Sequence, residues 1–515
     1  MTSRRRFLAD VGRGALTAAL GFRVAGDLGF VPAFAGQEPE TLTFGPLEPL
    51  VTLLQDTRTD RLLRAAMEQL RNGVALKRLV AAAALANARS FGGEDYVGFH
   101  TMMALSPALH MAAELPEQLQ PLPVFKVLYR NSARLQETGT RNTLRPVAAL
   151  PLPEGKAGGI ALRDAVRRRE KAEAEGLFAT IARGGAAEAF NHLLTEVQDS
   201  ADVHRVNLPW RAWELLDVVG PEHAHTLLRQ SLHYCLQNEP RSPGTWSSAA
   251  RNVLPKVFDA HHLEDRTPGT READDAWVEQ LSRTIFESTA EQAAEAAAAA
   301  LAEGFAPAAI AEAISLAANQ LVLRDVGRRP QEEQPGKPIG SVHGDSIGVH
   351  ASDSANAWRG MALAGNARNT FACLILGAWQ AAYDRVSRGG DFLKWAPLPI
   401  PATLDRVTAK DPAALVQELD AAVRDNLQAR ACAVVQRAGE LGHEARPLFD
   451  VLLRYAISED GALHAEKYYR TCAEEFAAAR PAFRWRHLVS LARVTASEYG
   501  RPAAGMAEAR RLLSC

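Results

Sequence analysis

The sequence predicts an all-α protein, and three observations lead to this fold class. Alanine, leucine, glutamate, arginine and glutamine dominate the 515 residues, and all five are good helix formers. Apolar residues recur at spacings of three and four, as they do on the buried face of an amphipathic helix. Convincing β alternation is absent, and no strand–helix alternation is present. We therefore expect a large multi-helix, bundle-like domain with long loops rich in proline and glycine.

The individual elements follow in chain order from these patterns. Apolar stripes predict helices within 53–70, 415–427 and 452–457, and a strongly apolar run predicts a further helix over 361–383. Clusters of proline and glycine predict the loops between helices. These loops cover 136–160, 238–275, 326–350 and 388–402. We place a weak boundary near 265–275 inside one helical domain, 36–515.

Composition excludes several classes of protein. The chain has 58 basic and 60 acidic residues and is 47% apolar, which fits neither a disordered chain nor a strongly basic nucleic-acid binder. Its five cysteines are widely spaced and form no C-x-x-C pair. A disulfide scaffold, a cysteine-ligated zinc site, an iron–sulfur cluster and covalent haem are therefore not expected.

The first 35 residues resemble an export signal. Ser3-Arg4-Arg5-Arg6-Phe7-Leu8 matches the core of the twin-arginine signal, and Ala33-Phe34-Ala35 supplies an A-x-A cleavage site. The resemblance implies export of the folded chain by the twin-arginine machinery to the periplasm or medium, often with a cofactor already bound. No apolar run of about 20 residues remains after cleavage, so we expect no transmembrane segment.

One stretch, 341–359, gathers more chemistry than any other. It holds His343, Asp345, His350, Asp353 and Asn356 within fourteen residues, between a Pro/Gly loop and an apolar helix. A helix that starts near 349–352 places His350 and Asp353 on one face, where they can bind one metal ion or orient a histidine as a base. The alternative is that Ser352 or Asp353 caps the helix. We select His343, His350 and Asp353 as catalytic candidates.

Further candidates lie in two earlier stretches. His100 stands in an apolar segment, where a buried imidazole needs a hydrogen-bond partner or a metal. His204 precedes Trp210 and Trp213 in a helix that we expect to hold Pro209 in its first turn. The tryptophans, with Tyr129, are candidates for the wall of a substrate pocket, or they belong to the core. His464, four residues before Tyr468, is a weaker candidate.

Two known site patterns occur in unfavourable contexts. Gly344-Asp345-Ser346-Ile347-Gly348 fits the G-x-S-x-G elbow of serine hydrolases, but the residues before it form a poor strand. Two E-x-x-H pairs, as in di-iron bundles, lie beside Pro221 and between Gly439 and Gly442. These pairs are Glu222–His225 and Glu440–His443.

The order of the histidine segments resembles a known family. Gly98-Phe99-His100 comes first, a helix with Phe190-Asn191-His192 and one led by His204 follow, and the loop of His343 and His350 comes last. This order is distantly similar to the questin oxidase-like family, helical proteins linked to oxygen-dependent cleavage of quinones. The resemblance covers three short segments and bears on His100, His204, His343 and His350 alone.

We therefore expect an exported, metal-dependent oxidoreductase that acts on a small organic substrate. His100, His204, His343 and His350 would ligate divalent iron, copper or manganese, with Asp353 or Glu94 completing the site. A non-catalytic helical binding or scaffold protein of the cell envelope is the alternative, and a serine hydrolase that uses Ser346 is the least favoured.

Overall fold

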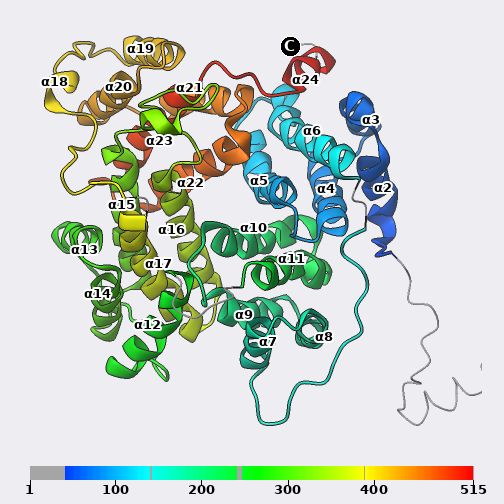
Figure 1. Cartoon of the computed structure of the whole chain (residues 1–515). Coiled ribbons are helices and arrows are strands. Elements are labelled where there is room, and N and C mark those ends of the chain that lie inside the picture. The colour runs from blue at the N-terminus through cyan, green and yellow to red at the C-terminus, as the bar shows by residue number, and fades with distance from the viewer. Residues whose placement is uncertain (1–40, 140–141, 240–245, 388, 514–515) are drawn as a thin grey trace, which may run out of the picture. The chain divides into compact units, whose positions relative to one another are not determined.

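The computed structural model describes residues 41–139, 142–239, 246–387 and 389–513. In this part of the chain the architecture is built from helices. These residues form twenty-three α-helices, short 3-10 turns and no strand beyond three isolated bridges, which confirms the all-α fold class (Figure 1). None of the described helices is both long enough and apolar enough to span a membrane. The signal at 1–35 lies outside the described residues.

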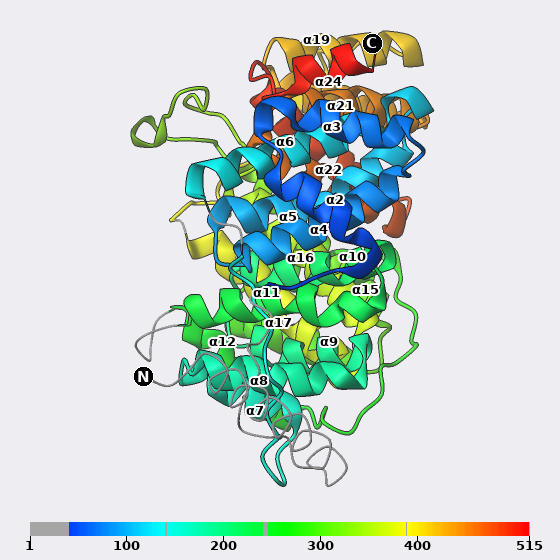
Figure 2. The ribbon, with the colours of Figure 1, turned by 90° about the vertical axis from the view of Figure 1, so that its right-hand side faces the viewer.

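The first half of the chain contributes eleven helices. They are α2 (Glu48–Asp56), α3 (Thr59–Arg71), α4 (Leu76–Phe91), α5 (Tyr96–Ala113), α6 (Pro121–Thr138), α7 (Gly158–Arg167), α8 (Lys171–Ile181), α9 (Ala186–Val197), α10 (Val203–Val219), α11 (Ala224–Gln237) and α12 (Trp246–Ala260). Helices α2 to α6 lie together on one side of the molecule, the side that faces the viewer in Figure 2.

The second half contributes twelve helices. They are α13 (Asp275–Glu287), α14 (Ala290–Ala302), α15 (Pro307–Arg324), α16 (Ile347–Ala364), α17 (Ala367–Ser387), α18 (Pro401–Leu404), α19 (Pro412–Arg424), α20 (Gln428–Glu440), α21 (Arg446–Ser458), α22 (His464–Ala478), α23 (Trp485–Glu498) and α24 (Met506–Leu512). Residues Thr43–Cys515 form one compact unit, and segment 265–275 lies inside it, where Arg271 pairs with Phe305.

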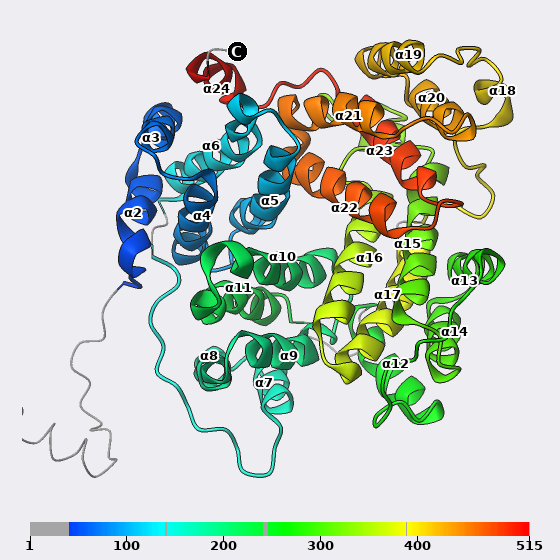
Figure 3. The same ribbon diagram turned by 180° about the vertical axis from the view of Figure 1, so that it is seen from behind.

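Four helices that are distant in sequence pack in a closed ring at the centre of this unit. Helix α5 packs against α10, α10 against α16, α16 against α22, and α22 against α5 (Figure 3). Their interior is buried, and the largest fully buried side chains include Trp358 of α16 and Tyr468 and Tyr469 of α22. The ring therefore brings residues from all parts of the sequence into one region.

Two glycines let these helices approach their neighbours closely. A Cβ atom on Gly98 of α5 would come within 2.5 Å of the Phe91 ring, and one on Gly348 of α16 would come within 2.5 Å of the backbone nitrogen of Val322. Neither contact leaves room for a side chain. Each glycine stands two residues before a histidine of the ring, so both fix where that histidine lies.

Several expected boundaries were wrong, and local capping explains the differences. The helix expected over 361–383 is two helices, because Gly365 ends α16 and Asn366 caps α17 by accepting the amide of Asn369 at 3.0 Å. Pro209 lies inside α10 and not in its first turn, since the Asp202 cap starts the helix at Val203. Helix α12 occupies part of the loop expected at 238–275.

Candidate functional site

Four histidines converge where the ring helices begin. His100 is the fifth residue of α5, His204 the second of α10, His350 the fourth of α16 and His464 the first of α22. The centroids of neighbouring rings are 4.8 Å apart for His100 and His204, 6.0 Å for His204 and His350, 5.4 Å for His350 and His464, and 5.1 Å for His464 and His100. We call these four residues the histidine cluster.

The caps of the helices place these imidazoles. Asp95 accepts the Gly98 amide at 2.8 Å and starts α5, and Asp202 accepts the amides of His204 and Arg205 at 3.0 and 3.1 Å and starts α10. Ser346 caps α16 through the amide of Val349. Each capping residue lies two to five residues before its histidine. The position at which each helix begins therefore determines where its histidine lies.

Helix α22 begins differently. Ala462 and Leu463 both have positive φ angles, 48° and 65°, directly before His464. Non-glycine residues adopt this left-handed conformation at a cost of about 1–2 kcal/mol each, and such strain gathers at functional sites. The strained turn therefore holds His464 in the cluster at an energetic cost.

Replacement of Ala462 by glycine tests this strain. Ala462 is exposed, so A462G removes little contact area, and it is expected to raise the free energy of unfolding by about 0.5–1 kcal/mol. A421G, at an exposed position in the ordinary helix α19, is expected to lower it by a similar amount. Urea denaturation measures both. Destabilisation of A462G to the extent of A421G would show that the turn is not strained.

Two Nε2 atoms of the cluster, those of His100 and His204, have no hydrogen-bond partner. The Nε2 atoms of His350 and His464 lie 3.4 Å apart. Those of His100 and His204 are buried and accept or donate no hydrogen bond. The Nδ1 atom of His100 donates to the Tyr96 carbonyl at 2.7 Å, and that of His204 lies 3.7 Å from an Asp202 carboxylate oxygen. This arrangement leaves the Nε2 lone pair of His100 free inside the protein.

Burial favours the neutral form of three of these imidazoles, those of His100, His204 and His464. It lowers the pKa of His204 to about 4, despite the nearby Asp202 carboxylate, and lowers the pKa values of His100 and His464 well below the ordinary value. The ammonium group of Lys467 adds to the lowering at all three. Burial in turn lowers the pKa of Lys467 to about 8, although Asp353 and Glu466 favour its charge. A neutral imidazole is the form of histidine that can bind a metal ion.

Aromatic rings and a cavity complete the surroundings. Phe99 lies 5.0 Å from the His100 ring and 5.2 Å from the His204 ring, and Tyr234 donates from its hydroxyl to Asp202 at 2.6 Å. A cavity of about 310 Å³ lies beside the cluster. Its polar lining consists of Asp202, His350, Gln380, Tyr383, Asp384 and Ser387. A small molecule in this cavity would lie against His350.

The selected residues fall into two groups. His100, His204 and His350 meet in the cluster, whereas His343 lies against Glu498, with 3.9 Å between its Nδ1 atom and the carboxylate. Asp353 is buried on the same helix as His350 but accepts from the Thr471 hydroxyl at 2.7 Å. His464 takes the place that the sequence assigned to His343. No local signal in the sequence distinguished His464 from His343.

The expected substrate pocket is divided. Trp210 and Trp213 line a separate cavity of about 750 Å³ with His110, Glu214 and Arg470, and no cluster histidine borders it. His110 is ten residues beyond His100 on α5, which corresponds to about 15 Å along the helix. Tyr129 lies elsewhere, against Gly505. The three aromatic residues therefore do not form one pocket.

The two alternative patterns were wrong as sites. Ser346 is the cap of α16 and no strand precedes it in the described residues, so it is not the nucleophile of a hydrolase elbow. His225 packs near Phe178, whereas His443 lies near the Lys410 carbonyl, so the two E-x-x-H pairs do not meet.

Comparison with known proteins and a direct geometric search add two facts. No protein-family model, curated protein or solved structure matches the chain. Within the described residues, no group of three or more His, Cys, Asp or Glu side chains stands ready in the geometry of a metal site. The four imidazole rings of the histidine cluster therefore lie close together, but their nitrogen atoms are not arranged around one common point.

Proposed function

We propose that the protein is a metal-dependent oxidoreductase of the cell envelope, with the histidine cluster as its metal centre. The observation that carries the proposal is the convergence of four imidazoles from four helices, two of them buried and two partly buried. The Nε2 atoms of His350 and His464 lie 3.4 Å apart, and those of His100 and His204 are buried without a hydrogen-bond partner. Buried polar atoms without partners are costly, and a bound ion would satisfy them.

The spacing of the rings supports this assignment. Two nitrogen ligands about 2.0–2.1 Å from a tetrahedral ion are about 3.3–3.4 Å apart, and the rings that carry them are about 5 Å apart between centroids. The His350–His464 pair already has this nitrogen separation, and the four neighbouring centroid distances run from 4.8 to 6.0 Å.

The ligand type favours particular metals. The four side chains of the cluster are all imidazoles, which suit iron, copper and zinc, whereas manganese is more often held with carboxylates. We therefore propose iron or copper from the metals expected from the sequence. Such an ion would supply one-electron chemistry between an organic substrate and an acceptor such as dioxygen.

The surrounding residues of this chain orient and insulate the centre. The Tyr96 carbonyl and the Asp202 carboxylate hold the Nδ1 sides of His100 and His204, as outer partners do for metal-bound histidines. Phe99 and Tyr234 exclude water from one side. The cavity beside His350 has polar walls that include Asp202, Gln380 and Tyr383, so it suits a small substrate with hydrogen-bonding groups.

The compartment follows from the export signal. The twin-arginine resemblance supports transport of the folded chain, and folded transport fits a centre that is built from four helices and buried in the core. The resemblance to the questin oxidase-like family supports oxidative chemistry and bears on three of the four cluster residues, His100, His204 and His350.

Elemental analysis of the purified full chain tests the proposal. We expect about one iron or copper ion per chain in the parent protein. The H350A/H464A variant is expected to hold none, because it removes the closest pair of nitrogen atoms. The matched control is H343A, since His343 is as buried as His464 but lies outside the cluster. H343A is expected to keep the metal.

Reduction and reoxidation of the bound metal distinguish an oxidoreductase from a protein with a structural metal site. The metal-loaded protein is expected to be reduced by dithionite and reoxidised by air, with a matching change in its absorption or electron paramagnetic resonance spectrum. Zinc alone in the parent would contradict the oxidoreductase proposal. Loss of the metal from H343A together with retention in H350A/H464A would contradict the assignment of the site.

A further inference from the structure

A third cavity does not border the histidine cluster, and four arginines line it. Its volume is about 740 Å³, and it lies between α7, α9, α12 and the start of α17. The arginines are Arg163, Arg167, Arg251 and Arg368. Arginine is the side chain best suited to bind carboxylates and phosphates, because its planar guanidinium group presents several donors in a fixed fork.

Three of these four arginines are already neutralised. Arg167 makes a bidentate contact to Asp199, at 2.6 and 2.7 Å. Arg251 pairs with Glu239 and lies 3.6 Å from an Asp199 carboxylate oxygen. Arg368 pairs with Glu264 at 3.1 Å, on the far side of the cavity.

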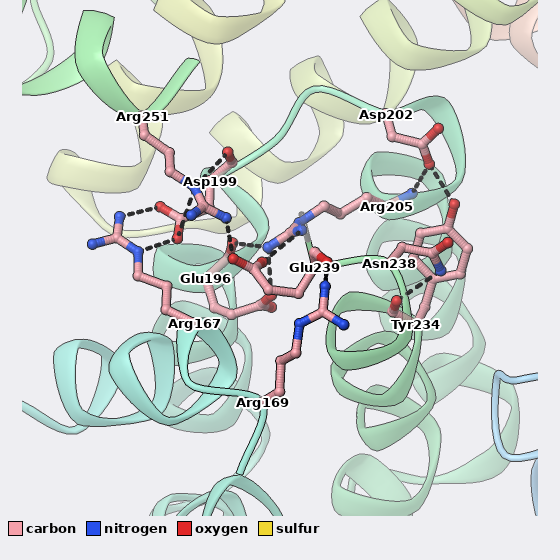
Figure 4. A network of polar contacts seen from close by, with 10 residues as sticks. All are labelled: Arg167, Arg169, Glu196, Asp199, Asp202, Arg205, Tyr234, Asn238, Glu239 and Arg251. Carbon is pink, nitrogen blue, oxygen red and sulfur yellow. Dashed lines mark hydrogen bonds and ion pairs between the residues drawn. The ribbon is translucent and has the colours of Figure 1, made fainter. Parts of the chain in front are cut away.

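The pairs of Arg167 and Arg251 belong to a balanced network that forms the inner wall of the cavity (Figure 4). Within the network, Arg205 binds Glu196 at 2.6 Å and lies 3.7 Å from Glu239. Three carboxylates, those of Glu196, Asp199 and Glu239, face three guanidinium groups, those of Arg167, Arg205 and Arg251. Each carboxylate of the network therefore already pairs with one of its three arginines, and none pairs with Arg163.

Arg163 is the arginine of this cavity that has no partner among the described residues. It makes no ion pair or hydrogen bond, and its Nε atom is buried. Burial lowers the pKa of Arg163, and the charge of Arg167 lowers it further, although the carboxylates of Asp199 and Asp164 act in the opposite direction. The acidic residues that remain on the cavity, Asp259 and Asp265, are exposed on its rim, where water screens their charges.

The wall near Arg163 is apolar. Ile160, Leu254, Pro255 and Phe258 line it, and Leu254 and Phe258 are 7% and 5% exposed. We propose that this cavity binds a small organic anion, whose acidic group pairs with Arg163 and whose apolar body packs against Leu254 and Phe258. This site is separate from the proposed metal centre and does not depend on it.

Benzoate is a suitable probe, because it combines one carboxylate with one ring. Isothermal titration of the full chain with benzoate, benzamide and acetate separates the contributions of charge and ring. We expect benzoate to bind more tightly than either, since benzamide lacks the charge and acetate lacks the apolar body. R163Q is expected to weaken benzoate binding by about 10- to 100-fold, which corresponds to the loss of one charged hydrogen-bonded contact.

Three control variants make the outcome interpretable. R168Q changes an exposed arginine that pairs with Glu173 and does not line the cavity, and it is expected to bind benzoate as the parent does. R163K keeps the charge and is expected to retain part of the affinity, and its melting temperature shows whether position 163 tolerates substitution. H350A/H464A is expected to bind benzoate normally.

Each contrary result overturns the inference. No benzoate binding by the parent, equal binding of benzamide, or equal loss in R163Q and R168Q would show that Arg163 does not hold an anion. Loss of binding in H350A/H464A alone would place benzoate at the histidine cluster and overturn the inference about Arg163. That result would not contradict the proposed metal centre.

Discussion

Replacement of Arg205 by methionine is expected to lower the free energy of unfolding by about 3–5 kcal/mol at pH 7, the cost of removing one partner from a buried ion pair. The side chains of Arg205 and Glu196 are 1% and 0% exposed, and Arg205 also donates to the Glu196 carbonyl at 2.8 Å. Methionine fills most of the volume but leaves the carboxylates of Glu196 and Glu239 without their shared cation.

Chemical denaturation of a second variant separates the loss of the ion pair from the loss of packing as causes of the lower stability. Burial already raises the pKa of Glu196 to about 7 in the presence of Arg205. Without Arg205 the pKa of Glu196 rises further, so folding of R205M at pH 7 requires this carboxyl to take up a proton, and an amide at this position avoids that cost. R205M/E196Q is therefore expected to recover part of the lost stability. A cost below about 1 kcal/mol for R205M, or no recovery in the double variant, would contradict this account of the network.

Replacement of His487 by leucine is expected to change stability in a pH-dependent way. His487 is 3% exposed on α23, its Nε2 atom has no hydrogen-bond partner, and burial lowers its pKa to about 4. An unfolded histidine has a pKa of about 6.5. Between these values the unfolded chain binds a proton that the folded protein excludes, so the parent loses stability as the pH falls from about 6.5 to 4.

The comparison of parent and H487L isolates this effect. Above pH 7 the two proteins are expected to differ by about 1 kcal/mol or less, because leucine has a similar volume. At pH 4.5 the penalty in the parent is about 2–3 kcal/mol, at 1.36 kcal/mol per pKa unit, and H487L lacks it. Urea denaturation across this range measures the difference. A difference that does not change with pH would contradict burial of a neutral imidazole.

The helices could be predicted from the sequence because apolar spacing reports burial directly. Stripes at 415–427 and 452–457 correspond to α19 and α21. The stripe at 53–70 was wrongly treated as one element, since it spans α2 and α3 with a break at Thr57 and Arg58. Periodicity does not show such a break, because the apolar face continues across it.

The site could be predicted only in part, because the meeting of the four helices that carry its histidines depends on tertiary packing. His100, His204 and His350 each follow a capping residue at a helix start, which is a local signal that the sequence carries. The meeting of α22 with α5 and α16 is not a local property, so nothing in the sequence favoured His464 over His343. His343 lies only seven residues before His350 in the sequence, yet the loop directs it to Glu498.

X-ray absorption at the metal edge of the purified protein tests the central claim, that one ion is bound by the four cluster histidines. The account predicts about four nitrogen neighbours at about 2.0–2.1 Å, with the outer-shell scattering of imidazole rings. It also predicts that H464A loses one imidazole, whereas H343A keeps the parent spectrum. A first shell dominated by oxygen or sulfur, or a parent spectrum in H464A, would contradict it.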